Sequence, residues 1–326
     1  FWQRETELVR REVIPYQWDA LNDRIPGAEK SWCMHNFRLA GRIMAQSRQQ
    51  GAQYTPQAYT YRGYNALPND PAHPDENKFY GFLFQDTDFS KWIEAVGYSL
   101  IQHPDEALEA TADEAIDVVC AAQTPEGYLD TYYIINGMDG AFQNLRAHHE
   151  LYCLGHLIEG AVSYYQATGK DKLLRAACRF ADYVADFFGT ADGQCKGYPG
   201  HEIAEMALVR LYEVTQDEKY LRLSRFFINE RGQEPNYFVE EERRNAEREH
   251  RPVQSVNLAY HQAVKPVREQ DEAMGHAVRA VYLYSGMADV ARMTGDDSLK
   301  SACERLWRSI VQEKLYITGG IGATQI

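Results

Sequence analysis

Apolar residues recur along this chain with the period of an α-helix. Residues 91–102, for example, place apolar side chains at positions i, i+3, i+4 and i+7, which lie on one face of a helix. Sustained alternation of β-branched and polar residues is nearly absent, and only 127–133 and 197–199 are expected to be extended. The same helical period predicts further helices over 105–122, 149–167, 171–188, 201–214, 218–229, 272–294 and 298–315. The pattern therefore predicts an all-α protein.

Three helix junctions resemble one another, at 165–174, 212–221 and 291–299. Each combines a helix end, a Thr-Gly or Thr-Gln turn, an acidic first turn and a new apolar stripe. Such repeats predict stacked αα-hairpins, which either extend as an open solenoid or close into an α/α toroid. Long, unequal loops rich in polar and aromatic residues favour the toroid of an enzyme, and they are 50–80, 123–148, 189–201 and 232–270.

Charge and composition exclude some classes of partner. The formal net charge of −13 argues against nucleic acid and anionic membranes, which require clusters of Lys and Arg. The chain has no apolar run long enough for a membrane span and no secretory leader. Its six cysteines are scattered without CxxC spacing, which is typical of unpaired thiols in a reducing cytoplasm. We therefore expect a cytoplasmic protein. The charge-dense stretch 239–251 is expected to be a solvated helix or a mobile loop.

Several catalytic motifs are missing from the sequence. There is no GxSxG nucleophile elbow, and the glycines at 319–322 are not followed by a helix that could cradle a phosphate. His149-Glu150 begins an HExxH-like pattern, but Cys153 stands at its last position. His149, Cys153 and His156 would share one helix face and could hold a metal; the alternative is a helix face lined by hydrogen-bonded histidines.

Histidines beside glycine or acidic residues are the main candidates for chemistry. His149 is expected to open a helix, His201 to start another after a Gly/Pro loop, and His276 to lie within a third helical run. An isolated histidine in such a place is usually structural. Three of them, each on a different hairpin of a toroid, would point toward one shared pocket. Neutral imidazoles there could form hydrogen bonds with sugar hydroxyls.

Two aspartates are weaker candidates for sugar contact. Asp86 lies with Asp88 ahead of a helix, where N-capping is the main alternative. Asp130 lies in a loop with aromatic residues, where turn chemistry is an equal alternative.

These residues belong to a set of motifs that resembles glycoside hydrolase family 127, the β-L-arabinofuranosidase family, over essentially the whole chain. No single motif is decisive, but their joint order and spacing are specific. The stretches that carry the resemblance are 13–18, 84–88 with 91–92, 127–131, 149–152, 155–156, 200–201, 266–268, 275–279 and 316–324.

The resemblance implies an (α/α)6 barrel, here expected over 1–326 as one catalytic domain that is incomplete at its C-terminal end and lacks the family's β-sandwich domains. It implies that His149, His201 and His276 contact the arabinofuranose. In the family, retaining hydrolysis uses a zinc-bound Cys nucleophile and a Glu acid/base that lie beyond this chain. We therefore assign no catalytic residue and no metal ligand here, and expect the chain alone to hold no zinc and to be inactive.

The expected ligand is a plant arabino-oligosaccharide or a related glycan, with no nucleic acid and no membrane; a homodimer stays open. Two alternatives remain. One is another (α/α)6 carbohydrate enzyme, such as an unsaturated glucuronyl hydrolase, in which Asp86 or Asp130 would be indispensable. The other is a non-catalytic helical scaffold, in which the three histidines would not converge.

Overall fold

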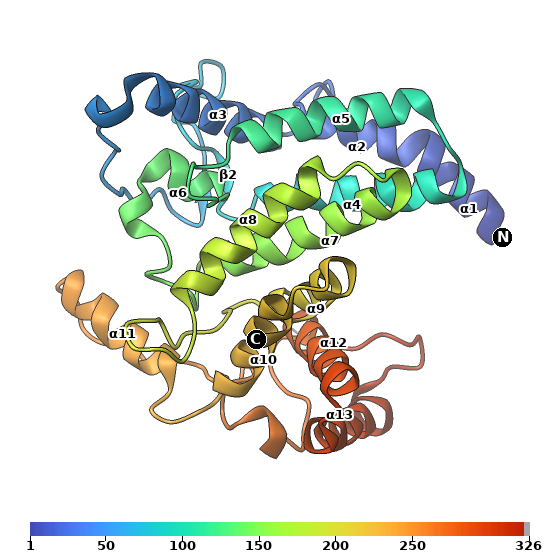
Figure 1. The fold of residues 1–326 in the computed structure, drawn as a ribbon, viewed down its shortest axis with the longest axis vertical. Coiled ribbons are helices and arrows are strands. Elements are labelled where there is room, and N and C mark those ends of the chain that lie inside the picture. Colours follow the sequence, from blue (N-terminus) through green and yellow to red (C-terminus); the bar gives the residue numbers. More distant parts are fainter. Residues whose placement is uncertain (323–326) are drawn as a thin grey trace. The chain divides into compact units, whose positions relative to one another are not determined.

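Helices make up almost all of the regular structure in the computed structural model, which describes residues 1–322 (Figure 1). This confirms the all-α prediction. The only strands in the described range are the short β1 (Asn65–Ala66) and β2 (Gly81–Phe82), which pair antiparallel. The α-helices are α1 (Trp2–Leu8), α2 (Ile14–Leu21), α3 (Cys33–Gln50), α4 (Asp86–Gln102), α5 (Glu106–Ala121), α6 (Thr131–Asn136), α7 (Glu150–Thr168), α8 (Lys172–Phe187), α9 (Ala204–Thr215), α10 (Glu218–Glu230), α11 (Tyr237–Arg248), α12 (Ala277–Thr294) and α13 (Asp297–Ser309).

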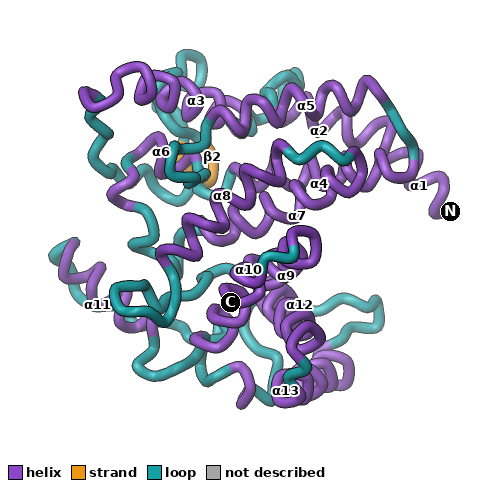
Figure 2. The backbone as a smooth tube through the Cα atoms, in the orientation of Figure 1, coloured by secondary structure: helices purple, strands orange, loops and turns teal. Residues whose placement is uncertain are grey.

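Short π-helical turns follow α1 and α13, and loops join the remaining elements (Figure 2). No helix within residues 1–322 has both the length and the apolar composition that crossing a bilayer requires. None of the six cysteines forms a disulfide.

Sequence periodicity located the helices better than it located their ends. The helix expected from residue 91 begins at Asp86, and the one expected from residue 272 begins only at Ala277. The expected extended segment 127–133 is partly wrong, because α6 begins at Thr131 behind an aspartate cap. No strand forms at 197–199; the nearest β-type pairing is a bridge between Phe188 and Cys195.

Helix α3 was not predicted, although seven of its residues are buried. Its last five residues, Gln-Ser-Arg-Gln-Gln, are polar, and Gly41 interrupts its apolar stripe. Glycine also lowers helix propensity, so the local sequence signal for this helix is weak although its first half is buried.

Contacts divide the chain into two compact units. The first comprises Phe1–Ala141 and His156–Tyr183, and its helices pack closely where side chains are small. Gly160 on α7 faces the backbone of Ser90 on α4 so tightly that a Cβ would lie 2.6 Å from the Ser90 carbonyl oxygen. One turn along, the hydroxyl of Ser163 donates to the carbonyl of Glu94 at 3.0 Å. Small residues thus set the spacing of α4 and α7.

The second unit comprises Phe142–Gly155 and Val184–Ile326. Its hairpins α9–α10 and α12–α13 each turn through a left-handed residue, Gln216 or Gly295, followed by an aspartate that caps the next helix. This is the repeated junction seen in the sequence. The two hairpins share an apolar cluster formed by Val209, Leu221, Ile228, Val267, Leu283, Met287, Val290, Ala291, Leu299, Ala302 and Leu306.

Helix α11 corrects the expectation of a solvated helix or mobile loop over 239–251. It is helical, but one face is buried, and Glu241 and Glu242 are each 1% exposed. Those carboxylates bind other parts of the second unit, as described below. Because the stretch is rich in charged residues, its sequence did not indicate that some of these side chains are buried.

Candidate functional site

The second unit brings His149, His201 and His276 together. The ring centroids of His149 and His201 are 5.5 Å apart, and those of His201 and His276 are 5.8 Å apart. Tyr152 packs against His201 at 4.3 Å, and Tyr282 lies 6.3 Å from it. Three imidazoles from separate segments thus form one cluster rimmed by aromatic rings.

Two of the three histidines occupy chain positions slightly different from the expected ones. His149 directly precedes α7, as predicted. His201 lies in the loop before α9, which begins only at Ala204. His276 is not inside a helix but is the N-cap of α12, where its Nδ1 accepts the backbone N–H of Arg279 at 3.4 Å. All three imidazoles therefore lie at or just before the start of a helix.

Two glycines allow the backbones to approach at this cluster. A Cβ at Gly200 would overlap the carbonyl oxygen of Leu145, so the loop bearing His201 touches the loop bearing His149. A Cβ at Gly275, whose φ is +76°, would overlap the carbonyl oxygen of Ala259. Glycine is required at both positions by close contact, and at Gly275 also by the left-handed backbone.

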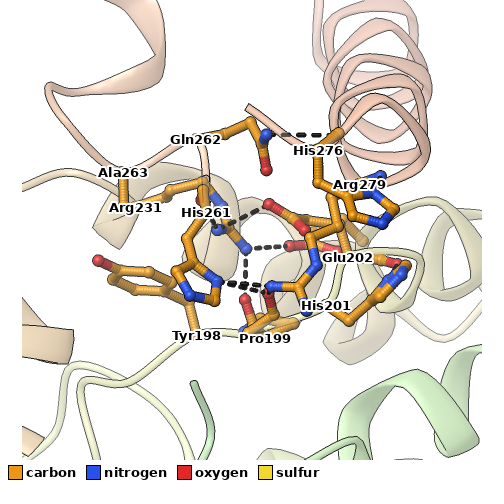
Figure 3. Close-up of polar contacts among 12 residues, drawn as sticks. Tyr198, Pro199, His201, Glu202, Arg231, His261, Gln262, Ala263, His276 and Arg279 are labelled. Carbon is orange, nitrogen blue, oxygen red and sulfur yellow. Dashed lines mark hydrogen bonds and ion pairs between the residues drawn. The ribbon is translucent and has the colours of Figure 1, made fainter. Parts of the chain in front are cut away.

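A fully buried arginine, Arg231 at the end of α10, ties the surrounding loops together (Figure 3). Its guanidinium donates to the carbonyl of Pro199 at 2.7 Å and to that of His261 at 2.9 Å. It also forms ion pairs with Glu202 at 2.8 Å and Glu205 at 3.1 Å. The contact between Arg231 and Glu202 is an ion pair without hydrogen-bond geometry. Neither carboxylate oxygen of Glu202 has a hydrogen-bonding partner among the described residues.

One guanidinium can neutralise only one of the two carboxylates beside it. Burial raises the pKa of Glu202 to about 8, and the charge of Arg231 offsets only part of that effect. The raised pKa favours the protonated form of Glu202 beside Arg231.

The loop bearing His149 is held by buried carboxylates. Glu241 on α11 accepts the backbone N–H groups of Leu145 at 2.6 Å and Arg146 at 3.0 Å. Glu150, in the first turn of α7, accepts the N–H of Phe142 at 2.9 Å. Burial raises the pKa of Glu241 to about 7, against the lowering effect of those N–H groups. The 142–149 loop is thus anchored at its start and in its middle.

Burial favours the neutral form of His201 and His276. Burial lowers the pKa of His201 to about 2, and the positive charge of Arg279 lowers it further. The pKa of His276 is lowered by the same two causes in the same order. Burial and then Arg279 lower the pKa of His261, which lies beneath the cluster, to about 3. Neutral imidazole offers one donor and one acceptor, which suits uncharged hydroxyl groups.

The two aspartates belong to the first unit and make local contacts there. Asp86 does not cap α4, so the N-cap interpretation is wrong for it. Its carboxylate accepts the hydroxyl and backbone N–H of Thr131 at 2.5 and 2.7 Å. Burial raises the pKa of Asp86 to about 6, while the contacts with Thr131 lower it. Asp130 caps α6 by accepting from Tyr132 at 3.1 Å and Tyr133 at 3.4 Å, which is the turn chemistry weighed against sugar contact.

Residues 1–322 contain no group of three or more His, Cys, Asp or Glu side chains placed to hold a metal ion. The face of α7 with His149, Cys153 and His156 is therefore not a metal site by geometry. Arg231, His261 and Arg279 were missed by sequence reasoning. Arg231 and His261 lie in segments without a motif, whereas Arg279 lies in the 275–279 motif, where the spacing Gly275-His276-x-x-Arg279 could have pointed to it.

The fold and the cluster place the protein among all-α proteins with a polar, aromatic-rimmed site built on loops. The model of the β-L-arabinofuranosidase GH127 catalytic domain matches residues 1–325. A non-reducing end β-L-arabinofuranosidase of Bifidobacterium longum subsp. longum is 36% identical over 331 residues, covering 100% of this chain and 47% of that protein.

Solved structures agree. A GH127 β-L-arabinofuranosidase from Geobacillus stearothermophilus T6 is 45% identical, with a TM-score of 0.85 over 99% of this chain and 46% of that one. A second GH127 β-arabinofuranosidase is 38% identical, with a TM-score of 0.77 over 99% and 43% of the respective chains. The chain belongs to glycoside hydrolase family 127, which confirms the resemblance seen in its motifs, and it spans about half the length of these relatives.

Proposed function

We propose that this chain supplies the sugar-binding wall of a glycosidase that removes β-L-arabinofuranosyl residues from plant glycans. The observation that carries the proposal is the cluster of His149, His201 and His276, which come from three separate segments. Membership of the family supports the substrate class, because the matched relatives are named as arabinofuranosidases.

The cluster suits a small neutral sugar. Neutral imidazoles exchange hydrogen bonds with hydroxyl groups without the cost of burying a charge. The ring of Tyr152, 4.3 Å from His201, adds an apolar surface of the kind that packs on the face of a sugar. Anchoring of the loops by Arg231 and Glu241 keeps these groups in place before the sugar arrives.

In this proposal, hydrolysis proceeds with retention through a covalent glycosyl intermediate, with a zinc-bound Cys as nucleophile and a Glu as acid/base. No described residues of this chain form a site that fits zinc, so the proposal assigns those groups to residues outside the chain. This chain's own part is to bind and orient the sugar. The chain alone is expected to show no turnover, and measurable turnover would contradict that assignment.

A glucuronyl hydrolase would require Asp86 or Asp130 as a proton donor. The contacts of Asp86 with Thr131, and the helix-capping contacts of Asp130, account for these carboxylates structurally. The observations therefore favour the arabinofuranosidase.

The test is cleavage of 4-nitrophenyl β-L-arabinofuranoside by the full-length gene product that contains this chain. We expect release of L-arabinose. The His201→Ala variant should lower kcat/KM about tenfold or more, because losing a hydrogen bond in a buried site costs about 1–3 kcal/mol. His73→Ala is the matched control, since the His73 side chain is exposed and its ring contacts the nearby Asp70. The absence of cleavage, or equal activity of the two variants, would contradict the proposal.

A further inference from the structure

Arg279, in the first turn of α12, contacts both histidine-bearing loops. Its backbone N–H donates to Nδ1 of His276 at 3.4 Å. Its Nη1 donates to the carbonyl of Gly200, the residue before His201, at 2.7 Å. The side chain is 6% exposed and lies over the ring of Tyr260 at 4.7 Å. One residue therefore fixes the position of two imidazoles.

The contacts determine which nitrogen of each imidazole carries the proton. Nδ1 of His276 accepts an N–H, so in the neutral ring the proton must be on Nε2. Nδ1 of His201 lies 2.9 Å from the carbonyl oxygen of Glu202, which can only accept. His201 therefore carries its proton on Nδ1, and its Nε2 has a lone pair.

A further contact fixes the arrangement from beneath. Nδ1 of His261 lies 2.6 Å from Nη1 of Arg279 and 3.2 Å from the carbonyl oxygen of Gly200, so the Arg279 side chain is held between His261 and Gly200. The carbonyl of His261 is in turn bound by Arg231. The charge of Arg279 opposes a second proton on either His201 or His276, which keeps their donor and acceptor roles separate.

We propose that His201 and His276 meet the substrate with opposite polarity, and that Arg279 is the positioning residue that maintains this difference. Nε2 of His201 accepts a hydrogen bond from a sugar hydroxyl, and Nε2–H of His276 donates one to a sugar oxygen. The site therefore requires a neutral sugar with a hydroxyl group facing His201. At the position facing His276 it tolerates any group that accepts a hydrogen bond. This inference rests on the proposed function for its ligand but not for the protonation of the rings.

The first test is ¹⁵N NMR of the histidine-labelled 326-residue chain, which reports the protonated nitrogen of each ring without ligand. We expect His201 to be protonated on Nδ1 and His276 on Nε2. Arg279→Met should turn His201 into a mixture of tautomers, because the backbone at Gly200, next to His201, loses its contact with the guanidinium and no longer holds the ring against the carbonyl of Glu202. His276 should be unchanged, because its partner is a backbone N–H. Arg292→Met, on the exposed side of the same helix, is the control and should alter neither ring.

The second test uses the full-length protein and monodeoxyfluoro arabinofuranosides. In each of them fluorine replaces one hydroxyl group, so that position can still accept a weak hydrogen bond but can no longer donate one. Fluorine at the position facing His201 should raise KM about tenfold or more, because a site built to bind a hydroxyl rejects an analogue that lacks it. Fluorine facing His276 should be tolerated within about threefold.

The same tautomer on both rings, or equal tolerance of fluorine at every hydroxyl, would overturn the inference. Correct tautomers without any arabinofuranoside cleavage would instead refute the proposed function and leave the protonation pattern standing. A collapse of folding in Arg279→Met does not remove the test, since the wild-type spectrum decides the assignment by itself.

Discussion

In the first unit, the buried carboxylates of Asp86 and Asp130 complete backbone hydrogen bonding at the start of α6, whereas in the second unit those of Glu202 and Glu205 flank a buried cation between loops. Asp86 and Asp130 accept from residues at the start of α6. Glu202 and Glu205 instead flank Arg231, which binds carbonyls of two loops. Carboxylates of the first kind stabilise local structure, and those of the second kind hold loops that carry candidate ligand-binding groups.

Of the variants that test this contrast, Arg231→Met should cause the largest loss of stability. The variant leaves two buried carboxyl groups without their cation and two carbonyls without a donor. We expect a loss of about 3–5 kcal/mol in the free energy of unfolding, which is typical of breaking a buried ion pair. Urea unfolding measures it, with the exposed Arg292→Met as control. A loss below about 1 kcal/mol would show that Arg231 does not hold the loops.

The pH dependence of stability should show the effect of Glu202. Its pKa is raised from 4.5 to about 8 in the folded state, so the folded chain binds more protons than the unfolded chain between those values. Stability should therefore decrease as pH rises from about 4.5 to about 8. Glu202→Gln, which cannot ionise, should flatten this slope in urea titrations at several pH values. An unchanged slope would mean that Glu202 is already ionised in the fold.

A smaller effect is expected for Asp86→Ala in the first unit. The change removes two hydrogen bonds to Thr131 inside a buried region, which should cost about 1–3 kcal/mol of stability. The KM for an arabinofuranoside should stay unchanged in the full-length protein. If activity disappears while stability is retained, Asp86 has a catalytic role and the glucuronyl hydrolase alternative regains support.

The smallest effect is expected for the helix caps, which occur in both units. Asp130→Ala and Asp217→Ala each remove an N-cap, and each should cost about 1 kcal/mol in the free energy of unfolding. Thermal and urea unfolding measure both variants. Equal losses for the two variants would show that Asp130 contributes to stability as an ordinary N-cap. A much larger loss for Asp130 would indicate a further role for its buried carboxyl group.

Much of the fold could be predicted because it depends on local signals. The periods of α9, α10 and α13 and the Thr-Gly junctions are visible in sequence, whereas α3 escaped because Gly41 and the polar residues at its end weaken its apolar stripe. The three histidines were found through their glycine and acidic neighbours. Arg231 and His261 could not be found, because their roles arise from contacts between residues about thirty positions apart.

The close approach at Gly200 and Gly275 has a consequence for protein engineering. Because a side chain at either glycine would collide with a neighbouring carbonyl, the Gly-His pairs cannot be altered without rebuilding an adjacent loop. Under the proposed function, attempts to redirect the site to another sugar should therefore leave both pairs intact and vary Tyr152 and Tyr282, whose rings border His201.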